Sequence, residues 1–262
     1  MKEDLFWIRS TPSLMNIPEP FCSGVDLLRY LNDHTSDLED LPASQHKLGL
    51  YYEDCINHLI NKSTKVIDLK RNIVVTKNKK TLGEFDFIGR TSEKDFHLEC
   101  AIKFYLRVGS GEQLSDFIGP GKRDRLDIKW QRMLEHQLPL SETNDGLRTC
   151  HQHEISPSAR ALLIQGYLFH PLDEPAQQLH PAINKHHLKG WWIYAKNLQK
   201  VQGDFQYQIL RKPYWLRFSE TGLMNFAALT EQMISLKQPC LIRRLDSSAR
   251  EIDRGFVLNN DW

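Results

Sequence analysis

The chain has 262 residues, of which 40% are hydrophobic and 26% are charged, a composition typical of a globular protein with a sizeable core. Its 34 lysines and arginines nearly balance 33 aspartates and glutamates, so any attraction for nucleic acid has to be local. No apolar run approaches the roughly 18 residues of a membrane span, and the first residues do not resemble a signal peptide. The five scattered cysteines indicate reduced thiols, and we expect a cytoplasmic protein without a membrane segment.

Residues 1–43 predict an N-terminal arm with a short helix at about 24–31. A longer amphipathic helix is expected at 45–61, because apolar residues recur there at the spacing of one helix face. These residues are Leu48, Tyr52, Cys55 and Leu59. Glu53 lies on the flank of this stripe, close to the buried side of the predicted helix.

The middle of the chain alternates between strand and helix patterns. Strand-like runs lie at 64–76, 82–88 and 95–106, with a turn at 77–80 between the first two. A second helix at 124–137 is expected to stop at Pro139, followed by a polar loop at 141–157 and an apolar strand at 161–169. This αβββαβ order predicts an α/β fold whose mixed central sheet is flanked by helices, with strands 82–88 and 96–104 adjacent.

The sequence changes character beyond Pro171. We therefore predict a core at 44–170 and a C-terminal α+β extension at 171–262 that packs on it. The expected elements of the extension are strands at 191–195, 205–211, 214–218 and 240–245, and a helix at 222–236 that begins at Ser219.

The most informative strand is 96–104. Its even positions are apolar, from Phe96 to Phe104, and its odd positions include His97, Glu99 and Lys103. Successive side chains alternate across a strand, so one face is apolar and packs on a helix, while the other carries ionisable groups. A solvated outer face is the simpler interpretation of the second face and is common in sheets.

The neighbouring strand favours a functional interpretation. In Gly83–Ile88, Phe85 and Phe87 are expected to face inward and Glu84 and Asp86 to face the other side. Two adjacent strands then bring up to three carboxylates to one side of a sheet, where they repel each other unless a proton or cation joins them. Hard oxygen ligands of this kind suit Mg²⁺ or Mn²⁺.

A helix with Glu53, then Gly-Glu-Phe-Asp-Phe, then His-Leu-Glu-Cys-Ala-Ile-Lys-Phe-Tyr-Leu resembles the PD-(D/E)XK nuclease superfamily. More narrowly, these motifs resemble the bacterial family called domain of unknown function 1853, with similarity over about 45–195. The resemblance implies a restriction-endonuclease-like αβββαβ core with Mg²⁺ or Mn²⁺ as cofactor. It implies Asp86 and Glu99 as metal ligands and Lys103 as the lysine of the motif. Glu53 corresponds to a carboxylate often found on the helix, and all four are candidate catalytic residues.

The sequence departs from this pattern at one point. The superfamily usually separates the carboxylate and the lysine by one residue, but Glu99 and Lys103 are four apart. Their Cα atoms would lie roughly 13 Å apart in a regular strand, unless a bulge shortens the distance.

Basic residues form two groups that could contact phosphates. One is the run at 62–80, and the other is a helical stripe. The candidate nucleic-acid-binding residues are Lys77, Lys79, Lys80, Lys122, Arg125, Lys129 and Arg132. A solvated helix face, partly paired with nearby aspartates, is an equally valid interpretation of the stripe.

Two functional hypotheses follow from these observations. The first is a metal-dependent nuclease that hydrolyses phosphodiester bonds, with DNA as its partner. The second is a catalytically inactive nucleic-acid-binding or assembly protein on a nuclease scaffold. The retained carboxylates favour the first hypothesis, and the long spacing between Glu99 and Lys103 favours the second.

Overall fold

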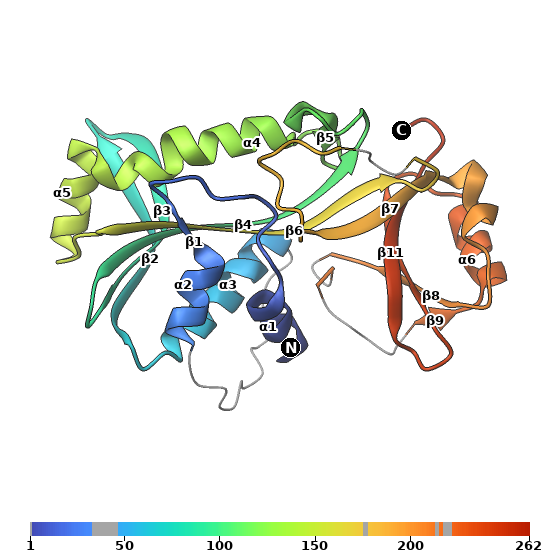
Figure 1. Cartoon of the computed structure of the whole chain (residues 1–262), viewed down its shortest axis with the longest axis horizontal. Helices are drawn as coiled ribbons and strands as arrows, with labels where there is room; N and C mark the ends of the chain where they lie inside the picture. Colours follow the sequence, from blue (N-terminus) through green and yellow to red (C-terminus); the bar gives the residue numbers. More distant parts are fainter. Residues whose placement is uncertain (1, 33–46, 175–177, 213–214, 217–221) are drawn as a thin grey trace.

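Figure 1 shows the computed structural model, which describes residues 2–32, 47–174, 178–212, 215–216 and 222–262. Within these residues the chain forms a mixed α/β structure around one eleven-stranded sheet. The strand order is β2-β3-β4-β6-β7-β11-β10-β8-β9, with β1 beside β6 and β5 beside β4.

The strands are β1 (Cys22–Ser23), β2 (Val66–Lys77), β3 (Lys80–Thr91), β4 (Asp95–Arg107), β5 (Phe117–Ile118), β6 (Ala159–Pro171), β7 (Leu188–Tyr194), β8 (Gln206–Leu210), β9 (Leu223–Met224), β10 (Cys240–Leu245) and β11 (Glu251–Leu258). The α-helices are α1 (Lys2–Ser10), α2 (Gly24–Leu31), α3 (Leu48–Asn61), α4 (Leu126–Arg132), α5 (Asn144–Gln152) and α6 (Phe226–Met233). Shorter helical segments are η1 (Leu114–Asp116), the π-helical η2 (Met133–Gln137), η3 (Leu138–Glu142) and η4 (Ala195–Val201).

Helices cover both faces of the sheet around β4 (Figure 1). α1, α2 and α3 pack on one face, where Leu59 of α3 and Leu98 of β4 belong to the same buried cluster. α4 packs on the opposite face, where Trp130 of α4 and Tyr105 of β4 share a second cluster. β4 alternates between these two clusters, which confirms that its apolar face packs on a helix.

Strands β3 and β4 are antiparallel neighbours in a mixed sheet, as the sequence predicts. β4 then pairs in parallel with β6 from Phe96↔Ala159 to Leu106↔Phe169. Gly166 in β6 has φ +138°, and a Cβ at this position would lie 1.7 Å from the carbonyl oxygen of Lys103. Only glycine allows so close an approach of the two strands at this point.

The C-terminal part continues the same sheet rather than starting another. β7 pairs in parallel with both β6 and β11, and β10 lies between β11 and β8. α6 packs on these strands, where Leu229 shares a buried cluster with Tyr207 and Ile242. None of the five cysteines forms a disulfide. Within the described ranges, no helix combines the length and the apolar character needed to cross a bilayer.

Several elements differ from the sequence-based prediction. The helix expected at 124–137 is α-helical only to Arg132, and the helical path continues through η2 and η3 past Pro139. Proline is compatible with this position because it falls in the first turn of η3, where an N–H has no partner within the helix.

The predicted polar loop at 141–157 contains α5, so the loop prediction is wrong there. Thr143 begins this helix, and its side chain accepts a hydrogen bond from the N–H of Gly146. The helix is mostly polar, and its few buried residues do not form the long apolar stripe that predicts a helix.

Two terminal elements were not predicted, and one helix starts later than expected. α1 and β11 were missed, and charged residues interrupt the strand pattern in β11. α6 begins after Asn225, whose side chain accepts from the N–H of Ala228. Ser219 and most of the expected strand at 214–218 lie outside the described residues.

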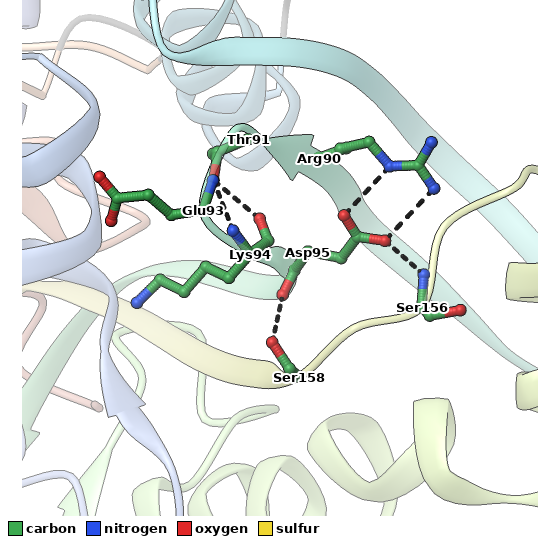
Figure 2. Close-up of polar contacts among 7 residues, drawn as sticks. All are labelled: Arg90, Thr91, Glu93, Lys94, Asp95, Ser156 and Ser158. Carbon is green, nitrogen blue, oxygen red and sulfur yellow. Dashed lines mark hydrogen bonds and ion pairs between the residues drawn. The ribbon is translucent and has the colours of Figure 1, made fainter.

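The turn between β3 and β4 is held by polar contacts to Asp95 (Figure 2). Arg90 Nε donates to Asp95 Oδ1 at 3.2 Å, and the Ser156 N–H donates to Asp95 Oδ2 at 2.6 Å. The carbonyl of Lys94 accepts from both the N–H and the hydroxyl of Thr91. Asp95 thus ties the hairpin of β3 and β4 to the segment that enters β6.

We expect Asp95→Asn to lower the free energy of unfolding by roughly 1–3 kcal/mol, because a charge-assisted bond and an ion pair are lost at a largely buried carboxylate. Urea unfolding followed by circular dichroism measures this change. The exposed Asp204→Asn is the matched control and should change stability by less than about 0.5 kcal/mol. Equal stability of the two variants would contradict the anchoring role of Asp95.

Candidate active site

The candidate site lies where β3 and β4 separate. Their backbone pairing runs from Arg90↔Asp95 to Phe87↔Leu98 and ends there. Beyond that point two carboxylates bridge the strands by hydrogen bonds to the backbone. Glu99 Oε1 accepts a hydrogen bond from the N–H of Asp86 at 3.4 Å. Asp86 Oδ2 accepts from the N–H of Cys100 at 2.8 Å. These bonds satisfy backbone groups that the ladder leaves without partners.

The strand alternation is interrupted at Asp86, which corrects the prediction that Phe85 and Phe87 share a face. Phe85 packs edge-on against the ring of His97, with ring centroids 4.8 Å apart, in a cluster with Leu140. Phe87 belongs to the opposite cluster, with α3. On the other side of Asp86, the facing segment of β2 contains Asn72 with a left-handed φ of 55°. Asp86 therefore occupies an irregular part of the sheet, between the two buried clusters.

Glu99 is fully buried and is held in place by hydrogen bonds. His97 Nε2 lies 2.9 Å from Glu99 Oε1, and Gln137 Nε2 donates to Glu99 Oε2 at 2.5 Å. His97 is also fully buried, and its Nδ1 lies 3.1 Å from Ser141 Oγ. A solvated outer face for His97 and Glu99 is therefore excluded, because η2 and η3 cover this part of β4.

Asp86 is the most strongly perturbed acid of the site. Burial raises the pKa of Asp86 to about 8, and the negative charges of Glu99 and Glu53 act in the same direction. The hydrogen bond from Cys100 and the positive charge of Lys129 act in the opposite direction. At neutral pH this shift favours the protonated form of Asp86, and a cation near the carboxylates would favour the ionised form instead.

Glu53 approaches this site from α3. Burial raises the pKa of Glu53, and the positive charge of Arg71 on β2 opposes this shift. Arg71 Nη2 lies 3.9 Å from Glu53 Oε2, and its Nη1 donates to Asp54 Oδ1 at 2.8 Å. The charges of Glu53, Asp86 and Glu99 therefore influence one another in the structure.

The lysine whose charge acts on Asp86 is Lys129 of α4, whereas Lys103 of β4 is ion-paired with Asp124. Lys129 Nζ donates to Gln137 Oε1 at 2.8 Å, so Gln137 joins Lys129 to Glu99. Burial lowers the pKa of Lys129, and the charge of Lys103 adds to this, whereas Asp86 and Glu99 oppose it. Lys103 Nζ instead donates to Asp124 Oδ2 at 2.5 Å, on the loop before α4.

The other basic candidates are distributed over three places. Lys77, Lys79 and Lys80 are exposed at the β2–β3 turn, roughly 20 Å from Asp86 along β3. Lys122 Nζ lies 4.6 Å from the centre of the Trp262 ring, and Arg125 is paired with Asp127 at 2.6 Å. Arg132 is exposed and close enough to influence Lys129. Among the described contacts of the predicted helical stripe, those of Lys129 alone involve the carboxylates.

Sequence reasoning did not assign a site role to His97 or Gln137. His97 shares the strand face of Glu99, and this spacing alone could have suggested contact. Gln137 is placed by the π-helical turn η2, which shifts the side-chain direction after Arg132. No helical periodicity in the sequence predicts this shift.

The carboxylates offer oxygen ligands of the kind that Mg²⁺ and Mn²⁺ prefer. Asp86 and Glu99 form a pair, and Glu53 lies within electrostatic range. Among the residues that the structure describes, no group of three or more histidine, cysteine, aspartate or glutamate side chains is arranged to hold a metal ion. A hard cation held by Asp86 and Glu99 alone would therefore need most of its ligands from water or substrate.

The raised pKa of Asp86 predicts how stability depends on pH without metal. Between about pH 4 and 8 the folded state binds more protons at Asp86 than the unfolded state, so stability decreases as pH rises. We expect Asp86→Asn to raise the melting temperature by several degrees at pH 8 and by little at pH 5. Calorimetry in EDTA tests this, with Asp204→Asn as control. An equal shift of Asp86→Asn at both pH values would contradict the assignment.

Comparisons with known proteins identify the family. No curated protein and no solved structure matches the chain. The sequence model of the family described as domain of unknown function (DUF1853) matches residues 3–258. The similarity therefore extends on both sides of residues 45–195, where the motifs lie. This match includes the carboxylate site and the C-terminal strands, and it shows that the chain belongs to the family domain of unknown function 1853.

Proposed function

We propose that this protein is a divalent-metal-dependent nuclease that hydrolyses phosphodiester bonds of DNA. The proposal rests on Asp86 and Glu99, whose carboxylates accept backbone hydrogen bonds across β3 and β4 where the strand pairing ends. The charges of Glu53 and Lys129 act on Asp86 at the same place. Carboxylates that retain a proton in a protein interior, with a lysine beside them, are typical of functional sites.

The order of elements supports the same proposal. Apart from the inserted β5 and α5 and the short helical segments, α3, β2, β3, β4, α4 and β6 come in the order of the αβββαβ core of the PD-(D/E)XK superfamily. In this core the two carboxylates come from adjacent strands and the third from the preceding helix. We therefore propose a restriction-endonuclease-like core, to which β7–β11 add a C-terminal extension.

Asp86 and Glu99 would hold Mg²⁺ or Mn²⁺, and Glu53 would assist directly or through water. A bound ion of this kind neutralises charge that develops on a phosphate and lowers the pKa of its water. Gln137 and His97 fix the orientation of Glu99 by hydrogen bonds to its two oxygens. Asp86 must lose its proton before it can serve as a ligand, and the raised pKa of Glu53 acts in the same direction, so activity should rise with pH.

The lysine function is proposed for Lys129. Its pKa is lowered by burial, and Gln137 holds its ammonium group near the carboxylates. It can therefore orient an attacking water or hold a proton at Nζ. Lys103, paired with Asp124, would contact substrate phosphate at the border of the site. The long spacing between Glu99 and Lys103 is then no obstacle, because a helix provides the nearby lysine.

A second candidate function is a nucleic-acid-binding protein on an inactive nuclease scaffold. Two observations favour it: both oxygens of Glu99 already accept hydrogen bonds, and no third ligand is in place among the described residues. In both functions the partner is nucleic acid. Contacts to phosphates are proposed for Lys77, Lys79, Lys80, Lys122, Arg125, Lys129 and Arg132.

Activity on DNA separates the two functions. With Mg²⁺ or Mn²⁺ we expect cleavage of labelled DNA that EDTA abolishes and that Asp86→Ala reduces by roughly 100-fold or more. Glu84→Gln, at an exposed carboxylate two residues away, is the control and should retain most activity. Folding of each variant is checked by circular dichroism. If the wild type cleaves no DNA in millimolar Mn²⁺ and binds no metal in calorimetry, the scaffold function replaces the nuclease.

The two lysines are distinguished by parallel substitutions. Lys129→Gln should lower kcat by roughly 100-fold, because a group that transfers or orients a proton is lost. Lys103→Gln should mainly raise KM, because it removes a phosphate contact at the border of the site. Steady-state kinetics at saturating metal measures both parameters. A larger loss of kcat in Lys103→Gln than in Lys129→Gln would reverse the assignment.

A further inference from the structure

Two neighbouring cavities lie outside the carboxylate site and share part of their walls. One has a volume of about 670 Å³ and is bordered mainly by residues 209–212 and 232–241. The other, of about 450 Å³, lies between the start of α3, the middle of β4 and the loop at 119–124. Their shared residues are Pro120, Gly121, Lys212 and Trp215. We call the two cavities together the basic groove.

The groove concentrates positive charge in a chain that is almost neutral as a whole. Its cationic residues are Lys47, Lys103, Arg123, Arg211, Lys212 and Lys237. Asp124 is the one carboxylate along the described walls, and Lys103 already neutralises it. The other five cations form no ion pair with any residue that the structure describes. Within the described part of the chain their charge is not balanced by a carboxylate.

Lys212 lies at the centre of this arrangement, in the wall common to both cavities. Its Nζ lies 4.4 Å from the centre of the Trp215 ring, which positions the charge by a cation–π contact. Nearby protein atoms displace water and lower the pKa of Lys212, although part of the residue faces solvent. A phosphate at this place would compensate for the lost hydration of the ammonium group.

Two elements that border the smaller cavity also carry residues of the carboxylate site. On α3 it includes Gly49, and Glu53 lies one turn further on the same helix face. The space beside Gly49 is open, since a Cβ there would meet no atom within 4 Å. On β4 the cavity includes Lys103, whose charge reaches Lys129 and thus the surroundings of Asp86. The groove and the carboxylate site therefore share α3 and β4 as supporting elements.

We propose that the basic groove binds the phosphate backbone of a single nucleic-acid strand and leads it to the carboxylate site. Both cavities have volumes in the range of roughly 300–1,000 Å³ that holds one small organic ligand, which suits a nucleotide in each. A duplex keeps its bases paired and cannot place them in two separate cavities. The C-terminal extension thereby provides substrate binding, a role that rests on the proposed function.

The test is DNA binding in EDTA, where cleavage cannot occur. Fluorescence anisotropy is measured with a labelled single strand of about 20 nucleotides and with its duplex. The double variant Lys212→Glu/Lys237→Glu should weaken single-strand binding by at least about tenfold and reduce the salt slope by about 1.4, as expected for two lost phosphate contacts. The matched control is Lys185→Glu/Lys196→Glu, two exposed lysines outside both cavities, which should keep wild-type affinity.

The outcomes separate the groove from the active site. The proposal is supported if the groove variant loses binding while Asp86→Ala still binds. This holds whether or not the wild type cleaves DNA with metal. Cleavage by the wild type with unchanged affinity and salt slope in the groove variant overturns the groove and leaves the nuclease in place. Tighter binding of the duplex than of the single strand also overturns the proposal. An equal loss in the control variant overturns it too, because the effect is then one of general charge.

Discussion

The candidate site depends on one pair of interactions, the bonds by which Asp86 and Glu99 bridge β3 and β4 where their backbone pairing ends. Cys100 donates its N–H to Asp86, and Asp86 donates its own N–H to Glu99. Unpaired N–H groups inside a protein are costly, so these carboxylates stabilise a separation that backbone pairing alone would not support. The gap in turn exposes Asp86 to charges from both faces of the sheet. Glu53 of α3 acts from one face, and Lys129 of α4 acts from the other.

The same two carboxylates affect both the stability of the fold and the chemical properties of the site. The carboxylates that bridge the two strands lie in a poorly solvated place, so burial raises the pKa of Asp86 and the negative charge of Glu99 raises it further. A divalent cation would relieve the repulsion between the two charges without protonation. The hydrogen bonds from His97 and Gln137 keep Glu99 oriented in either state. The helices thus contribute both the covering of the site and the polar groups that hold it.

Much of the core follows from its sequence. The periodic spacing of Leu48, Tyr52 and Cys55 predicts α3, and the alternation from Phe96 to Phe104 predicts β4 and its packing on a helix. The same alternation predicts that Glu99 and Lys103 share a strand face. Local patterns are strong in these segments because the residues pack in regular elements with one apolar face.

Four features of the site and the groove could not be predicted from the sequence, each for a physical reason. The change of face at Asp86 occurs opposite Asn72, whose backbone is left-handed, and Gln137 lies in a π-helical turn. Neither has a periodic signature. Lys129 is indistinguishable by spacing from Arg125 and Arg132, but the fold turns it toward the carboxylates while Arg125 pairs with Asp127. The basic groove combines residues from α3, β4 and the C-terminal part, which only the tertiary structure brings together.

The central claim is that Asp86 and Glu99 form one divalent-metal position. Anomalous X-ray scattering from crystals soaked in Mn²⁺ tests it most directly, because it locates the ion independently of activity. We expect one anomalous peak within about 2.0–2.6 Å of a carboxylate oxygen of Asp86 and of Glu99, and its loss in crystals of Asp86→Asn. A wild-type crystal without a peak at this position, or with the same peak retained in Asp86→Asn, would contradict the account.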